Sequence, residues 1–341
     1  MSDQTNSDVS KLHKSSMDAE RPTLKTIAFM TGLGVTTVSR ALKDAPEIGP
    51  ETKKRVQLIA KQIGYRPNRA GVRLRTGKTN VIALVLNTQD DIMGFTSQVI
   101  HGVASALAGT QYHLILTPYF SAKAPIEPIR YIVETGSADG IIFSRTEPDD
   151  QRVHYLKEHD FPFATHGRTD TGIEHAYHDF DNHAFARDTT KRLIASGRKK
   201  LALLTPPPHL NYYRHMVSGF YDGLHNSGAT GAPIEAVDLD TSLEDMREYF
   251  TQLMLSDDRP DGIICSGSAA TLAVVSGIEN AGMEIGREVD VAAKQSTLLL
   301  HWFRPKLIVT EENFKLAGQQ LGKAILGAIE GQDVSTLQSL G

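Results

Sequence analysis

TLKTIAFMTGLGVTTVSRAL, residues 23–42, has the pattern of two short helices joined by a tight turn. Thr23 is suited to cap the first helix, and apolar residues recur at helical spacing over 24–30. The Gly-Leu-Gly segment at 32–34 ends this helix, and a second helix is predicted over 35–42. Two helices joined by a short glycine-containing turn form a helix-turn-helix unit.

A third helix is predicted to begin at Pro50 and to end near Gly64. The apolar residues of the second and third helices predict one small core, formed by Val38, Ala41, Leu42, Val56, Ile59 and Ala60. Many small bundles share a three-helix pattern. At this point a bundle that does not bind DNA therefore stays an open alternative.

The outer face of the second helix carries residue types suited to reading DNA. Val35 and Thr36 are small enough to approach a groove floor, and Arg40 can donate two hydrogen bonds to a guanine. We expect these three residues to read bases. Further residues are expected to contact the DNA backbone, which positions the module without reading sequence: Thr23, Ser39, Lys43, Thr52, Lys53, Tyr65 and Asn68.

Charge is distributed unevenly along the chain. Residues 1–80 hold 15 lysines and arginines against 7 aspartates and glutamates, whereas the remaining residues hold 21 against 33. A basic head on an acidic body indicates that only the head meets a polyanion.

The segment GYRPNRAGVRLRTGKTN, residues 64–80, is a basic linker with a single leucine, Leu74. It is suited to a helix that forms on DNA and wedges Leu74 between base steps in the minor groove. The alternative is that Leu74 packs against the neighbouring domain.

The motifs TLKTIA, VTTVSRAL, GYRPN and LRTGKTN together resemble the head and hinge of the LacI/GalR family of transcriptional regulators. The resemblance places Val35, Thr36 and Arg40 at the family's base-reading positions and Leu74 at its intercalating leucine. There are two departures. Phe29 replaces a usual charged residue, and Gly71 replaces a common alanine, which makes hinge folding about 1 kcal/mol harder.

After the linker, apolar runs alternate with helical patterns. The runs are typical of strands buried on both faces of a parallel sheet: VIALVLN (81–87), YHLILTPY (112–119), ADGIIFS (138–144), FPFATHG (161–167), KLALLTP (200–206), PDGIICS (260–266) and VDVAAKQS (289–296). This alternation predicts doubly wound α/β sheets, in two lobes because the strands are too many for one small sheet.

Polar segments follow most of these strands, where ligands of such folds bind. These polar segments are rich in hydrogen-bond donors, and aromatic residues lie near them. Such a mixture is suited to a polyhydroxylated ligand. The body also resembles the periplasmic-binding-protein-like effector domain of LacI/GalR regulators, so the similarity covers about residues 22–335. It implies a homodimer with a sugar or sugar-phosphate effector, and it places Phe95, His166, Arg168 and Gln295 at effector positions. The strand-end segments and the residues near them add the candidates Asp91, Tyr213, Arg214, Ser268 and Lys294.

The family pattern changes at several effector positions. Met216 replaces an arginine, Gly267-Ser268 replaces Asn-Asp, and Ala293-Lys294-Gln295 replaces a Gly-aromatic-Asp segment. The loss of acidic side chains and the presence of Lys294, His166, Arg168 and Arg214 allow an anionic ligand. A neutral oligosaccharide or glycoside is preferred slightly over a sugar phosphate.

The predicted organisation is a disordered tail (1–21), a helix-turn-helix domain (22–67), a hinge (68–80) and an effector and dimerisation domain (81–341). The resemblance implies that the chain crosses between lobes near 184, near 310 and at the C-terminus. The first lobe then holds about 81–184 and 311–335, and the second about 185–310. Neither a last strand nor a leucine-heptad tail is visible after residue 335, which favours a dimer over a tetramer.

Other function classes have little support. No G-x-S-x-G, Walker A, G-x-G-x-x-G or H-E-x-x-H motif is present, so we expect no enzyme activity, cofactor or metal. One cysteine, no export signal and no long apolar run favour a cytoplasmic, nucleoid-associated protein that contacts no membrane. A transport-type solute-binding protein would need an export signal and no basic head.

The sequence therefore predicts a DNA-binding transcriptional regulator. A homodimer would place its heads on a pseudo-palindromic operator, and a sugar bound between the lobes would release it. Corepression would use the same architecture and stays an alternative.

Overall fold

The computed structural model describes residues 22–65, 77–87, 95–119, 125–296 and 298–341. The predicted tail, Asn68, Leu74 and Asp91 lie outside these ranges. The chain divides into two compact units, a head that ends at Thr79 and a body that begins at Asn80.

Over the described residues 22–65, the head contains three helices, as predicted: α2 (Leu24–Thr31), α3 (Val35–Leu42) and α4 (Pro50–Gln62). Thr23 caps α2 by accepting a hydrogen bond from the backbone of Thr26, whose own side chain accepts from the backbone of Thr23. The expected core residues are buried or partly buried, and they pack with Ile27, Ala28 and their neighbours. Gly32 ends α2 in the left-handed region, at φ 67°, which favours glycine.

The first lobe of the body is built on a six-stranded parallel sheet in the order β11-β5-β4-β3-β1-β2. Its strands are β1 (Val81–Asn87), β2 (His113–Tyr119), β3 (Gly140–Phe143), β4 (Phe163–His166), β5 (Ala176–Asp179) and β11 (Gln338–Leu340). One face packs against α6 (Phe95–Leu107) and α14 (Phe314–Glu330), and the other against α7 (Glu127–Thr135) and α8 (Gln151–Glu158). A short 3₁₀ helix, η1 (Val334–Leu337), precedes β11.

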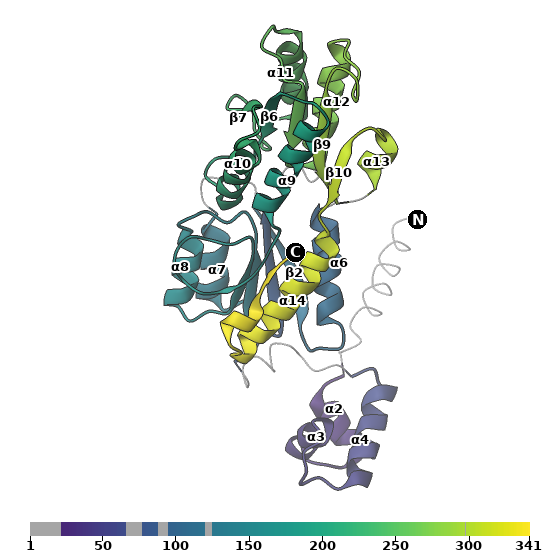
Figure 1. Ribbon diagram of the computed structural model, residues 1–341. Helices are drawn as coiled ribbons and strands as arrows, with labels where there is room; N and C mark the ends of the chain where they lie inside the picture. The colour runs from purple at the N-terminus through teal and green to yellow at the C-terminus, as the bar shows by residue number, and fades with distance from the viewer. Residues whose placement is uncertain (1–21, 66–76, 88–94, 120–124, 297) are drawn as a thin grey trace, which may run out of the picture. The chain divides into compact units, whose positions relative to one another are not determined.

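The second lobe is built on a five-stranded parallel sheet in the order β10-β9-β8-β6-β7. Its strands are β6 (Lys200–Leu204), β7 (Thr230–Pro233), β8 (Gly262–Cys265), β9 (Asp290–Gln295) and β10 (Ile308–Glu311). Helices α9 (Asn182–Ala195) and α10 (Asn211–Leu224) cover one face, and α11 (Leu243–Leu255) and α12 (Ser268–Asn280) the other; α13 (Leu299–Phe303) precedes β10. The predicted doubly wound, two-lobed body is confirmed (Figure 1).

The chain passes between the lobes twice, at 180–181 after β5 and at 312–313 after β10. The expectation of a third crossing at the C-terminus was wrong, because the terminal strand β11 pairs with β5 in the first-lobe sheet. β11 also corrects the statement that no last strand is present. It is three residues long and lies at a sheet edge, so it leaves no apolar run in the sequence.

The sequence also missed β5, β7 and β10, because these short strands lack long apolar runs. β2 was taken as buried on both faces. It is instead an edge strand, with Ile115 47% and Leu116 39% exposed. None of the helices in the described ranges combines the length and apolar character needed to cross a lipid bilayer.

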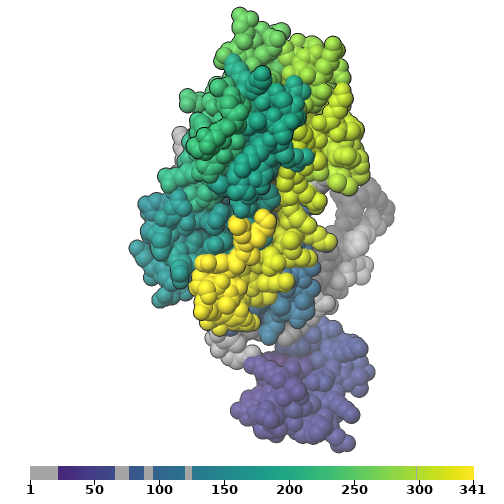
Figure 2. Space-filling model, in the orientation of Figure 1, coloured from purple at the N-terminus to yellow at the C-terminus, as the bar shows by residue number. Residues whose placement is uncertain are grey.

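Helices α6 and α14 lie side by side although they are far apart in the sequence, as the blue and yellow ribbons show in Figure 1 and the blue and yellow atoms in Figure 2. A methyl group on Gly102 would lie 2.2 Å from the carbonyl oxygen of Lys315, so only glycine fits there. We expect Gly102→Ala to lower the free energy of unfolding by about 1–3 kcal/mol, because the two backbones must separate. Urea unfolding measures this, with exposed Ser105→Ala in the same helix as control. Equal stability of the two variants would contradict the close packing.

Candidate DNA-binding face and effector cavity

The residues predicted to read bases share the exposed side of α3. Val35 is 41% exposed, Thr36 and Arg40 are exposed, and Val38 and Ala41 on the opposite side are fully buried. The packing of the three helices therefore leaves this face of α3 open to a groove.

Arg40 carries an acidic partner that the sequence did not indicate. Its guanidinium Nη1 lies 3.5 Å from Glu47 Oε1, and both side chains are about half exposed. An exposed pair of this kind is weak, so DNA can replace Glu47 as the partner of Arg40.

The residues predicted to contact the DNA backbone differ in the contacts that they make within the head itself. Lys53 Nζ lies 2.8 Å from Asp44 Oδ1 and donates to the Asp44 carbonyl, so it also fixes the turn after α3. Tyr65 packs against the head's core. Thr23 caps α2. Lys43 is exposed at the end of α3, and Ser39 and Thr52 are partly exposed.

The body encloses a cavity of about 540 Å³ whose wall comes from both lobes. The first lobe contributes Asn87, Phe95, Ser144, Arg145, Thr146, His166, Gly167 and Asp179. The second contributes Asn182, Tyr212 and residues 239–243, 266–270 and 294–296. Glu312 comes from the second connection, and Phe314 from the start of α14 in the first lobe. The volume is in the usual range for small-molecule sites.

Five of the residues predicted to bind an effector meet in this wall: Phe95, His166, Ser268, Lys294 and Gln295. Arg168, Tyr213 and Arg214 are not part of it. Arg168 pairs with the wall residue Asp179, and Arg214 is 60% exposed and contacts Asp170. Asp91 lies outside the described residues.

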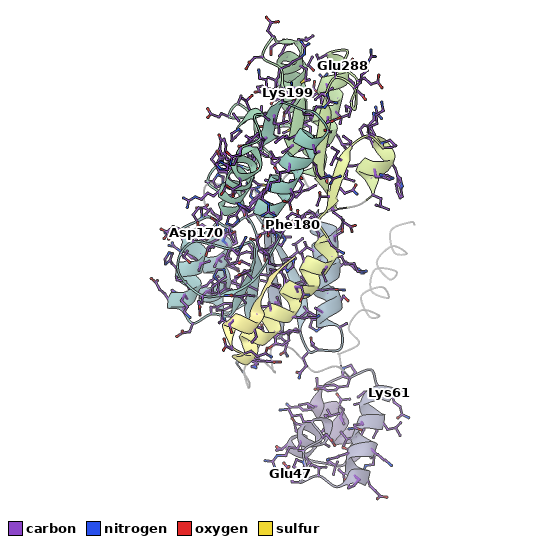
Figure 3. The ribbon with its side chains drawn as sticks, viewed as in Figure 1. Glu47, Lys61, Asp170, Phe180, Lys199 and Glu288 are labelled. Carbon is purple, nitrogen blue, oxygen red and sulfur yellow. The ribbon has the colours of Figure 1, made fainter. Side chains whose placement is uncertain are left out.

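Lys294 is buried at the junction of the two lobes. Its Nζ donates to Asn182 Oδ1 at 2.8 Å and lies 2.8 Å from Glu312 Oε2. Phe180, labelled at this junction in Figure 3, lies beneath the same ammonium group at 4.9 Å from ring centroid to Nζ. Asn182 follows the first connection and Glu312 belongs to the second, so Lys294 ties both together.

The other charged groups of the wall are also paired. Arg145 donates to both carboxylate oxygens of Asp240, at 3.0 and 2.5 Å. Asp179 accepts from Arg168 Nε at 2.7 Å. Burial lowers the pKa of His166 below its usual value, despite the nearby carboxylates of Glu312 and Asp179, so its ring is neutral at pH 7.

Aromatic rings and one unpaired amide complete the wall. Phe95 packs edge-on against Phe314, with ring centroids 4.7 Å apart. Gln295 is 4% exposed, and its Oε1 is a buried acceptor with no hydrogen-bond partner among the described residues. A ligand hydroxyl would satisfy it.

Sequence reasoning missed Asp240, Glu312 and Phe314 as wall residues. They follow β7 and β10, the two edge strands of the second sheet that the sequence did not reveal. Arg145 was recognised as the end of a strand but not as a site residue. Its φ of 57°, rare for arginine, is visible only in the structure.

Comparison with known proteins agrees with this architecture. Residues 23–68 match the bacterial regulatory proteins of the lacI family, and residues 79–337 match the periplasmic binding proteins and sugar binding domain of the LacI family. The chain belongs to the LacI family. The HTH-type transcriptional regulator AglR of Rhizobium meliloti (strain 1021) is 30% identical over 91% of this chain and 88% of its own. RafR of Escherichia coli is 37% identical over 60% of this chain and 61% of its own.

Solved structures of LacI-family regulators show the same fold. The lac repressor dimer bound to operator and the anti-inducer ONPF has a TM-score of 0.80 at 19% identity, over 92% of this chain and 94% of its own. The CelR–cellobiose complex has a TM-score of 0.67 at 21% identity, over 94% and 97%. The present protein is thus a LacI-family transcriptional regulator with a helix-turn-helix head and a two-lobed body.

Proposed function

We propose that this LacI-family protein is a homodimeric repressor of carbohydrate-uptake or catabolic genes, and that a neutral oligosaccharide bound in the cavity releases it from a pseudo-palindromic operator. The base-reading residues are Val35, Thr36 and Arg40, with Leu74 as the minor-groove wedge. The protein acts on DNA in the cytoplasm.

A neutral ligand is favoured over an anionic one because every cation in the described wall already has an acidic partner. Lys294 faces Glu312, and Arg145 faces Asp240. A phosphate or carboxylate would have to displace one of these carboxylates and leave it without its partner, at a cost in free energy. Hydroxyl groups can instead share these polar atoms and supply a donor to Gln295, while a sugar ring packs against Phe95 or Tyr212.

Relatives support the same class of ligand. The related CelR was solved as a complex with cellobiose, a neutral disaccharide. The cavity of about 540 Å³ is large enough for more than a single small group.

Exposed apolar surface on both lobes supports the homodimer. Ile115 and Leu116 lie on the edge strand β2, and Trp302, which is 71% exposed, lies with Phe303 on α13. Such patches mark contact surfaces of soluble proteins. A dimer would present two heads to half-sites about one helical turn apart.

A thermal-denaturation screen of the full-length protein tests the ligand class. The neutral disaccharides cellobiose, maltose and melibiose are compared with glucose 6-phosphate and galactose 1-phosphate at equal concentration. A ligand present at 100 times its Kd raises the free energy of unfolding by about 2.7 kcal/mol, so its effect on the midpoint temperature of unfolding is easily measured. We expect stabilisation by a neutral sugar only. Stabilisation by a sugar phosphate and by no neutral sugar would contradict the proposal.

A further inference from the structure

Arg145 occupies a backbone position that does not suit arginine. It follows strand β3 at the edge of the cavity, and its φ of 57° lies in the left-handed region. Glycine, asparagine and aspartate adopt this region at lower cost than a long side chain does. An arginine there indicates that its side chain has a use that offsets the backbone strain.

The strained backbone is held in place by a second arginine. Arg152, on α8, is 2% exposed and donates to the carbonyl oxygens of Ser144, at 3.2 Å, and Arg145, at 2.8 Å. Its charge is balanced by Asp150, 2.6 Å away, and its guanidinium stacks over the ring of Phe143. This buried group is therefore fully paired, and it fixes the direction in which Arg145 leaves β3.

Arg145 points across the cavity to the other lobe. Its guanidinium binds both carboxylate oxygens of Asp240, which follows β7 in the second lobe. Next to it, the carbonyl oxygen of Thr146 accepts from the backbone of Asn211, also in the second lobe, at 2.8 Å. These contacts join the lobes at a place distinct from the two chain connections, which meet at Lys294.

We propose that the Arg145–Asp240 pair is a latch that holds the two lobes closed over the cavity, and that Arg152 positions it. This inference rests on the proposed function in one respect only, namely that closure of the lobes changes how the heads bind the operator when a sugar is present. Closure itself is a property of the body alone and needs neither ligand nor DNA.

The exposure of the latch suits a reversible device. The Arg145 side chain is 25% exposed and that of Asp240 is 42% exposed, so water and salt reach both. An ion pair of this kind is worth little, and it can therefore bias two conformations without locking one of them. A buried pair such as Arg152–Asp150 could not open so readily.

The experiment measures the distance between spin labels on the two lobes of the full-length protein, without ligand or DNA. Cysteines replace the exposed residues Lys157 on α8 and Glu248 on α11, while the native Cys265 is buried and does not react. Labelled protein is mixed with excess unlabelled protein, so that each labelled dimer carries one labelled chain. The matched control is Arg304→Met, because Arg304 pairs with Glu279 inside the second lobe, at 2.8 Å, and both side chains are partly exposed.

We expect a predominantly closed population in the parent protein. Arg145→Asn suits the backbone and removes the pair, so the ratio of closed to open protein should fall by roughly five-fold. Arg152→Lys retains the charge opposite Asp150 but loses the planar fork, and it should open the lobes while the protein stays folded. Arg304→Met removes an ion pair within one lobe and should leave the distances unchanged.

The exchange Arg145→Asp with Asp240→Arg tests the pair directly, because each charge then meets its opposite with the positions reversed. Restoration of the closed population by this exchange supports the latch. In 1 M salt the parent protein should open, whereas the distances in Arg145→Asn should stay the same because the ion pair is already absent. Two results would overturn it: an Arg145→Asn distribution identical to that of the parent, or a parent protein that is already open. A failed sugar screen would refute the proposed ligand and leave these distances untouched.

Discussion

Replacement of Lys294 by methionine is expected to lower the free energy of unfolding of the body by about 3–5 kcal/mol. Methionine fills a similar volume but leaves Glu312 without its cationic partner, and the side chains of Lys294 and Glu312 are only 7% and 9% exposed. It also removes the donor to Asn182 Oδ1. Urea unfolding of the full-length protein, followed by the signal of Trp302 in the body, measures the loss.

The double variant Lys294→Met with Glu312→Leu removes both charges, so neither of them is left buried without a partner. Much of the lost stability should therefore return, although the ion pair at the junction of the lobes stays absent. A single variant as stable as the parent would show that Glu312 does not need the charge of Lys294. The junction would then not be held by a buried ion pair.

The second large effect is expected on DNA. Arg40→Ala should weaken binding to the cognate operator by about 1–3 kcal/mol and change binding to random DNA little, because a bidentate contact to guanine is lost. Titration of both duplexes at one salt concentration, by fluorescence anisotropy, gives the two differences.

The matched control for Arg40 is Lys43→Ala at the end of the same helix. A residue that contacts phosphate should weaken binding to all sequences about equally and reduce the salt dependence by about one unit of slope. If Arg40→Ala behaves as Lys43→Ala does, Arg40 contacts the DNA backbone and the assignment of base reading fails.

The head could be predicted from its sequence because each of its helices is specified by residues that are close together in the chain. Thr23 at a cap, Gly32 at a left-handed helix end and Val38 and Ala41 at core spacing each specify the same three helices. The partner of Arg40 could not be found in this way. Glu47 lies in the turn that follows α3, and only the folded turn brings its carboxylate to the guanidinium.

In the body, long apolar runs revealed the central strands and therefore the doubly wound fold. The edge strands β7, β10 and β11 are short and have no long apolar run, so the sequence did not reveal them. The segments that place Asp240 and Glu312 in the cavity follow β7 and β10 and were missed for the same reason. Lys294 lies in the cavity wall, where its charge allowed an anionic ligand beside the slightly preferred neutral sugar. Its pairing with Glu312, on a different strand connection, could not be read from the sequence.

The most direct test of the account is selection of bound sequences from a random duplex library by the full-length protein, at near-physiological salt. We predict a pseudo-palindrome whose half-sites lose their preference in Arg40→Ala, and whose binding weakens when the neutral sugar found in the thermal screen is added. Recovery of no shared motif, with binding that only weakens as salt rises, would contradict the assignment as a sequence-specific regulator.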